Sequence, residues 1–120
     1  MLTRKAVNDI IHAFLADLAQ EGYTPERAVL FGSYAYGKPK ETSDIDLALW
    51  DEHFIGCLPM DVPPIVHVQS RHRPLEVHTF AAGSTEDDDP FIAEILKKGI
   101  EISLLENRVS KNEIRFIRLG

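Results

Sequence analysis

The sequence predicts an α/β or α+β domain in which helices and strands alternate around one small sheet. Three observations lead to this prediction. The N-terminal segment repeats apolar residues at helical spacing, three short segments further on have the pattern of strands, and a second helical stripe begins near residue 91. A chain of 120 residues fits one such domain, and 44% hydrophobic with 27% charged residues is ordinary for a globular protein.

The first helix is predicted from an apolar stripe with a 3.6-residue period. Thr3 is placed to cap its start, and Gly22 offers the left-handed residue that ends a helix. Asp17 falls off the stripe, so we expect its side chain to be solvated. The stripe consists of Val7, Ile10, Ile11, Phe14, Leu15 and Leu18.

Three segments are predicted to be strands. Residues 28–31 form a short apolar run, which is typical of a buried strand. Residues 44–49 and 75–80 alternate with a period of two, so each has an aliphatic face and an opposite face that carries polar groups. The polar groups on these faces are Asp44, Asp46, Glu76 and His78.

Two more helices are predicted. One is expected to start after Asp61, which would cap it, with the following prolines in its first turn. The other covers residues 90–98, because Asp89 precedes a proline at the first helical position and Gly99 follows the last apolar residue. Residues 100–102 are expected to form a short strand or a turn.

The charge is unevenly distributed along the chain, whose net charge is −6. Residues 107–120 form a basic tail with four basic side chains against one acidic, which leaves nine basic against eighteen acidic in a domain spanning 1–106. Such an acidic body favours metal cations over polyanions, so nucleic acid is not the expected partner. Cys57 is the single cysteine, which excludes a disulfide framework and a Cys-rich zinc site. Without a signal peptide or an apolar run of about 18 residues, we expect a cytoplasmic protein that does not enter the membrane.

One stretch carries the chemistry. Gly32 and Ser33 directly follow the first predicted strand, and Asp44-x-Asp46 opens the second. Glycine lets the backbone turn close to a ligand, and the serine hydroxyl with nearby free N–H groups can hold phosphate oxygens. Two carboxylates on one strand face suit hard cations, so the stretch predicts a site for a nucleoside triphosphate with magnesium. Either half alone is unspecific, because Gly-Ser turns are common and Asp-x-Asp is often a solvated strand edge.

Ten residues separate Ser33 from Asp44, and this arrangement resembles the signature of the DNA polymerase β nucleotidyltransferase superfamily. Within it, the chain resembles the minimal nucleotidyltransferases that are antitoxin partners in HEPN–MNT toxin–antitoxin pairs. The similarity covers residues 3–105. It implies a polymerase β-like fold with a small mixed β-sheet flanked by helices. It also implies transfer of a nucleoside monophosphate, AMP from ATP, to an acceptor hydroxyl with two Mg²⁺ ions.

The resemblance also implies roles for the carboxylates. Asp44 and Asp46 would bridge both magnesium ions, and Glu76, at the position of the family's third carboxylate, would complete one metal site and activate the acceptor hydroxyl. Glu76 is the only acid inside an otherwise apolar strand pattern, which supports this assignment. The alternative is that Glu76 faces solvent on an edge strand. The histidines have no zinc-like spacing, but His78 shares the face of Glu76 and is a candidate to line the acceptor side.

The nucleotide-binding residues implied by the resemblance are Gly32 and Ser33. Many relatives carry a cation just before the second glycine of this loop, where the present chain has Tyr36. Lys38 or Lys40 is the candidate replacement as a triphosphate ligand. The alternative is that both are exposed loop lysines.

The acceptor follows from the resemblance and from chain length. An HEPN-type toxin is the expected protein partner, and a domain this short has no room for a large acceptor-binding module of its own. One alternative is a small-molecule nucleotidyltransferase, modifying for example an aminoglycoside, with the acceptor site formed across a homodimer. Another is a non-catalytic antitoxin that acts by binding, which the missing cation at Tyr36 favours and the three clustered carboxylates oppose.

Overall fold

A computed structural model describes residues 1–104 of the protein. The predicted domain boundary at 106 and the predicted basic tail at 107–120 lie outside this range. None of the helices within it combines the length and the apolar character needed to cross a membrane. In chain order the elements are α1 (Arg4–Gln20), β1 (Arg27–Phe31), α2 (Ser33–Tyr36), β2 (Ile45–Asp51), α3 (Leu58–Asp61), the 3-10 helix η1 (Pro63–Ile65), α4 (Val66–Ser70), β3 (Leu75–Ala81), α5 (Pro90–Lys98) and β4 (Ile100–Glu101).

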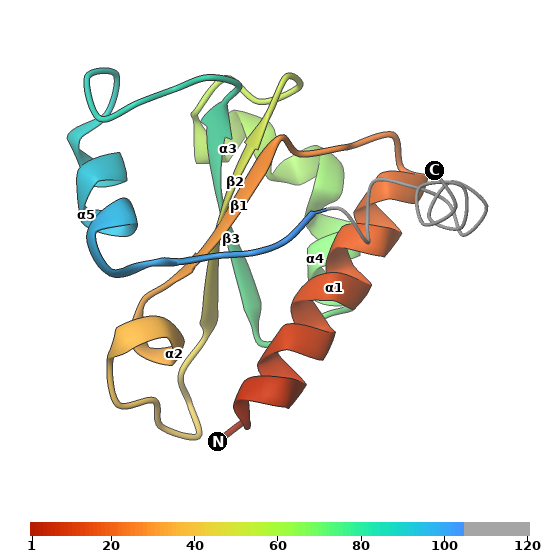
Figure 1. Ribbon diagram of the computed structural model, residues 1–120. Coiled ribbons are helices and arrows are strands. Elements are labelled where there is room, and N and C mark those ends of the chain that lie inside the picture. The colour runs from red at the N-terminus through yellow and green to blue at the C-terminus, as the bar shows by residue number, and fades with distance from the viewer. Residues whose placement is uncertain (105–120) are drawn as a thin grey trace, which may run out of the picture.

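The four strands form one mixed sheet in the order β3-β2-β1-β4. β1 runs antiparallel to both β2 and β4, whereas β2 and β3 are parallel. Helix α1 covers one side of the sheet and α5 the other (Figure 1). The α+β class and the small mixed sheet flanked by helices are therefore confirmed.

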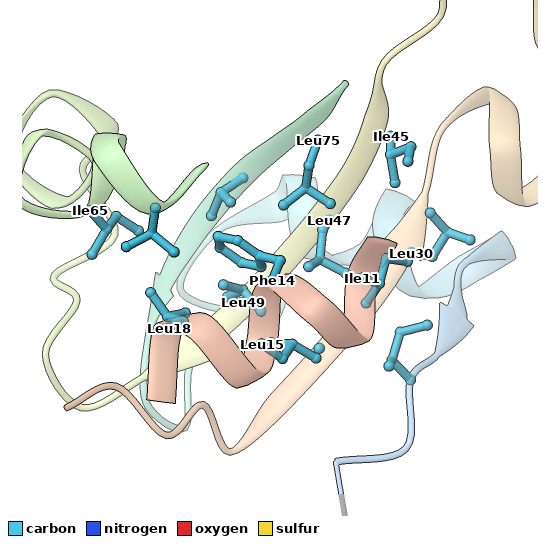
Figure 2. Packing of buried hydrophobic residues seen from close by; sticks show 14 of the residues in the cluster. Ile11, Phe14, Leu15, Leu18, Leu30, Ile45, Leu47, Leu49, Ile65 and Leu75 are labelled. Carbon is cyan, nitrogen blue, oxygen red and sulfur yellow. The ribbon is translucent and has the colours of Figure 1, made fainter. Parts of the chain in front are cut away.

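The larger core lies between α1 and the sheet. Thr3 caps the helix as predicted, because its Oγ1 accepts a hydrogen bond of 3.1 Å from the N–H of Ala6. The apolar stripe of α1 points into the sheet and meets Leu30, Leu47 and Leu49 (Figure 2). Each such side chain contributes about 1.5–3 kcal/mol when fully buried. The buried residues of α1 are Val7, Ile11, Phe14, Leu15 and Leu18.

A smaller core lies on the opposite face, under α5. Asp89 caps this helix by accepting a 2.9 Å hydrogen bond from the N–H of Phe91, as the Asp-Pro pair predicts. Ile92 and Ile95 are buried against the sheet. Both faces of β2 are therefore buried along most of the strand. Its polar side chains are accessible only at its start, outside this core. The cluster contains Val29, Phe31, Ala48, Trp50, Phe80, Ile92 and Ile95.

The predicted role of Asp61 is wrong. Asp61 ends helix α3 instead of capping the next helix. The predicted helical structure with prolines at its start does follow, as η1 and then α4. The Asp61 side chain is only 6% exposed and turns back to close the preceding loop. Although burial raises the pKa of this carboxyl, the hydrogen bonds outweigh burial and lower its pKa overall. Those bonds, at 2.8–3.0 Å, come from the backbone N–H groups of Ile55, Gly56 and Cys57 and from the hydroxyl of Thr79.

Helix α4 is fixed to α1 and to β3 by side chains. Asp17, expected to be solvated, instead binds two groups just after α4: Arg71 Nη2 at 3.0 Å and His72 Nε2 at 2.9 Å. The hydrogen bond from Arg71, followed by that from His72, lowers the pKa of Asp17 to about 2. On the other side of α4, the Gln69 Oε1 accepts the backbone N–H of Val77 at 2.9 Å. A helix of five residues is thus held in place by contacts that lie far apart in the sequence.

Candidate functional site

Three carboxylates meet where β2 and β3 begin. Asp44 directly precedes β2, and Asp46 is the second residue of that strand. The parallel register places Glu76 of β3 directly beside Asp46. Neighbouring strands are about 4.8 Å apart. The structure therefore brings together the three acids that the sequence singled out.

Crowding of these carboxylates perturbs Glu76. Its pKa is raised, first by desolvation, then by its hydrogen-bonding contact with Asp44 and by the negative charges of Asp44 and Asp46, while the nearby His78 partly offsets the rise. The alternative view of Glu76 is also partly correct, because β3 is an edge strand and the side chain is exposed. An acid in this setting is accessible from solvent and holds a proton more readily than an isolated glutamate.

Asp46 packs against the turn that follows β1. Gly32 has a φ of +75°, a conformation that L side chains rarely adopt. A Cβ at this position would overlap Asp46 Oδ2 and would lie 3.2 Å from Asp46 Cγ. The absence of a side chain at Gly32 is thus what allows the turn to lie against the carboxylate.

His78 lies beside Asp46 on the same face of the sheet. Its Nε2 is 3.4 Å from Asp46 Oδ1. The imidazole is edge-on to Phe31, with 4.8 Å between ring centres, and to Phe91, with 6.2 Å. These contacts hold the imidazole against Asp46, on the face of the sheet that it was predicted to share with Glu76.

The chemistry of the donors fits a hard divalent cation, because all three are carboxylates and their mutual repulsion would be relieved by a cation. Across residues 1–104, however, no three His, Cys, Asp or Glu side chains are already arranged as a metal-binding group. The oxygens of Asp46 lie near His78 and the turn at Gly32, whereas Asp44 and Glu76 are in hydrogen-bonding contact.

The predicted phosphate-binding turn lies on the β1 side of the carboxylates. Ser33 is the first residue of α2, and the N–H groups of Ala35 and Tyr36 both bond to the carbonyl of Gly32. The N–H groups of Ser33 and Tyr34 therefore remain outside the hydrogen bonds of the helix itself. They are the groups of this turn that can donate to an anion.

A cation that the sequence did not predict lies near this turn. Lys38 lies in the exposed loop after α2 and makes no hydrogen bond or ion pair with any residue up to 104. Instead, the Nζ of Lys98 lies 5.7 Å from the centre of the Tyr36 ring. Little in the sequence indicates this contact, because a basic last turn before Gly99 is explained equally well by the helix dipole.

A pocket of about 350 Å³ lies on the β3 side of the carboxylates, below α4. Arg73, at its wall, is exposed and forms no ion pair with any residue in the described part of the chain. A larger apolar hollow of about 760 Å³, between α1 and β4, contains none of the three carboxylates. The smaller pocket is lined by Asp44, Val66, Gln69, Ser70, Arg73, Pro74, Leu75 and Glu76.

The domain combines a small mixed sheet, an acidic cluster on two adjacent strands, and a glycine turn that opens a short helix. This combination is typical of nucleotidyltransferase domains. The sequence profile described as "Polymerase beta, Nucleotidyltransferase" matches residues 15–108. The chain therefore belongs to the polymerase β-type nucleotidyltransferase family, and the resemblance seen in the sequence is confirmed at this level.

A solved structure has a similar fold. It is the crystal structure of a candidate nucleotidyltransferase from Sulfolobus solfataricus, with a TM-score of 0.51 and 20% sequence identity over 88% of this chain and 86% of the other. At this identity the similarity concerns the fold. A search of curated proteins gives no significant match.

Proposed function

We propose that this protein is a magnesium-dependent nucleotidyltransferase that moves AMP from ATP onto a hydroxyl of a partner protein, and that the partner is an HEPN-type toxin for which this chain is the antitoxin. The observation that carries the proposal is the convergence of Asp44, Asp46 and Glu76 beside the Gly32 turn in a domain of the nucleotidyltransferase family.

In the proposed reaction the acceptor oxygen attacks the α-phosphorus of ATP. A bond forms between them, the bond from the α-phosphorus to the bridging oxygen breaks, and pyrophosphate leaves with that electron pair. The acceptor proton passes to a carboxylate or to water. When bound by Asp44, Asp46 and Glu76, magnesium would neutralise phosphate charge and make the acceptor hydroxyl more acidic.

The residues divide between the two sides of the acidic cluster. On the β1 side, the turn at Gly32 and Ser33 offers backbone donors to the triphosphate. On the β3 side, the exposed Glu76 would face the acceptor. Nucleotide and acceptor then approach the carboxylates from opposite sides.

A protein acceptor is supported by exposed apolar side chains on the segment that connects β2 to β3, of which Val66 lines the pocket at Glu76. Large apolar side chains that are exposed close together on a domain often mark a surface that binds another protein. Four of these follow one another within residues 55–66, and Val66 also lines the pocket beside the carboxylates. They are Ile55, Leu58, Met60 and Val66, with exposed fractions of 40–67%.

The experiment is incubation with ATP labelled on the α-phosphate, Mg²⁺ and a co-purified HEPN-type partner, followed by gel autoradiography and mass spectrometry of the modified residue. We expect label on the partner with wild-type protein and none with Asp46→Asn. Absence of label on any acceptor with each of the four NTPs would refute the enzymatic proposal.

Two other outcomes identify the alternatives. Label on an aminoglycoside, and none on the partner, would establish a small-molecule nucleotidyltransferase. Neutralisation of the toxin by Asp46→Asn as effectively as by wild type, with no label transferred, would establish an antitoxin that acts by binding alone.

A further inference from the structure

We propose that Lys98 binds the terminal phosphates of the nucleotide, the part of the triphosphate furthest from the reacting phosphorus. This inference rests on the proposed function and adds a residue to which the sequence analysis gave no role. It starts from the position of the Lys98 ammonium group, 5.7 Å from the centre of the Tyr36 ring at the end of α2.

The fold brings Lys98 to this place through β4. Leu30 of β1 pairs with Ile100 of β4, which follows directly on Gly99, so the last turn of α5 is held close to the end of β1 from which the turn at Gly32 continues. Gly99 makes this approach possible, since a Cβ there would overlap the carbonyl oxygen of Ile95 and would lie 2.5 Å from Val29 Cγ1. The C-terminal end of α5 accordingly lies next to α2 (Figure 1).

The two ends of the turn indicate which phosphate group Lys98 would contact. The α-phosphate has to lie at the carboxylates, where the bond is exchanged, and these contact the turn at Gly32. Tyr36 is at the other end of the turn, and Lys98 lies over it. A triphosphate that runs along the turn from the carboxylates therefore ends near the Lys98 ammonium group.

The electrostatics of the site favour this role. A triphosphate beside three carboxylates needs cationic neighbours, and Lys38 makes no contact that holds it toward the turn. Lys98 contacts the face of Tyr36, which is 51% exposed. Such an exposed cation–π contact is weaker than a charge-assisted hydrogen bond to phosphate, so the ammonium group can exchange one for the other when nucleotide binds.

A purely structural role is the competing explanation. Lys97 and Lys98 both lie in the last turn of α5, where the helix dipole favours cations. This explanation applies to both residues equally, whereas only Lys98 is placed over Tyr36 among the described contacts. Lys97 is therefore a matched control: it has the same charge and helix, but points about 100° away around the helix axis.

The test is equilibrium binding, measured by calorimetry with full-length protein and Mg²⁺, of a nonhydrolysable α,β-methylene analogue of ATP and of inorganic tripolyphosphate. We expect Lys98→Ala to weaken both ligands by about tenfold or more, and Lys97→Ala to change them by less than about twofold. Adding Tyr36→Arg to Lys98→Ala should restore most of the affinity, because it returns a cation to the end of α2. Thermal denaturation of each variant separates these effects from a loss of folding.

Two results would overturn the inference. If wild type binds the analogue and Lys98→Ala binds it equally well, the role of Lys98 is refuted while the proposed function stands. If wild type binds neither probe, both the inference and the nucleotide-dependent function fail.

Discussion

Asp46 and Gly32 occupy complementary space: the carboxylate of Asp46 lies where a side chain at position 32 would have to begin. The glycine turn and the second aspartate come from different strands, β1 and β2, whose register sets Phe31 opposite Asp46. The proposed phosphate-binding turn and the proposed metal-binding acid are therefore positioned by one contact, and a change in either residue moves the other.

Gly32→Ala should reduce nucleotidyl transfer by about 100-fold or more, because the added methyl group displaces Asp46. Gly83→Ala is a matched control, since Gly83 has almost the same φ, +76°, but an added methyl group there would meet nothing within 4 Å. Backbone strain should cost each variant about 1–3 kcal/mol of unfolding free energy, measured by urea denaturation, and Gly32→Ala should lose more because its methyl group also overlaps Asp46. Equal activity in the two variants would contradict the coupling of turn and carboxylate.

Asp44→Asn, Asp46→Asn and Glu76→Gln should each reduce transfer by at least about 100-fold without unfolding the domain. Removing one charge relieves repulsion within the cluster, so the melting temperature should stay the same or rise. Calorimetry with Mn²⁺ should show weakened metal binding in each. Glu94→Gln, which changes an exposed acid of α5, is the control, and normal transfer in any of the first three variants would refute the role of that residue.

Asp61→Ala should destabilise the domain by about 3 kcal/mol or more, because three backbone N–H groups and the Thr79 hydroxyl lose their acceptor in a buried position. Asp61→Asn should cost less, since one amide oxygen can still accept. Urea denaturation measures both, with the exposed Glu52→Gln as control. A loss below about 1 kcal/mol in the alanine variant would show that the loop at 55–57 does not depend on this carboxylate.

The pKa of Asp17, lowered to about 2, predicts the pH dependence of stability. The unfolded chain has a value near 3.9, so the contribution of Asp17 is complete above about pH 4, falls as the pH drops, and is lost below about pH 2. Asp17→Asn should therefore be less stable than wild type at pH 6, and the difference should shrink between pH 4 and pH 2. Denaturation midpoints across this range test it. Asp9→Asn, in an exposed pair on the same helix, is the control.

The local patterns of the sequence were sufficient for the main elements. The apolar stripe of α1 and the alternation in β2 and β3 depend on residues close in sequence, and burial follows them directly. The polar residues were predicted less well, because their partners are distant. Asp17 binds side chains 54 and 55 positions away, and Asp61 bonds back to its own loop as well as to Thr79.

In the candidate site, too, the features set by local sequence could be predicted, whereas those that depend on distant pairing could not. Asp44, Asp46 and Glu76 could be assembled from strand alternation and a resemblance, since each lies at the start of a strand. Lys98 could not, because its approach to Tyr36 depends on the pairing of a two-residue strand, β4, with β1. So short a strand leaves almost no periodic signal in the sequence.

The contact between Gln69 and Val77 limits how another chain can bind to this domain. β3 is an outer strand, and an outer strand with free N–H groups invites a foreign strand to extend the sheet. Here the Gln69 side chain accepts a hydrogen bond from the N–H of Val77, and the carbonyl of His72 accepts one from the N–H of Leu75. At the opposite edge β4 has only two residues. The first half of β3 and the two-residue β4 are thereby poor templates for β-augmentation or amyloid-like stacking.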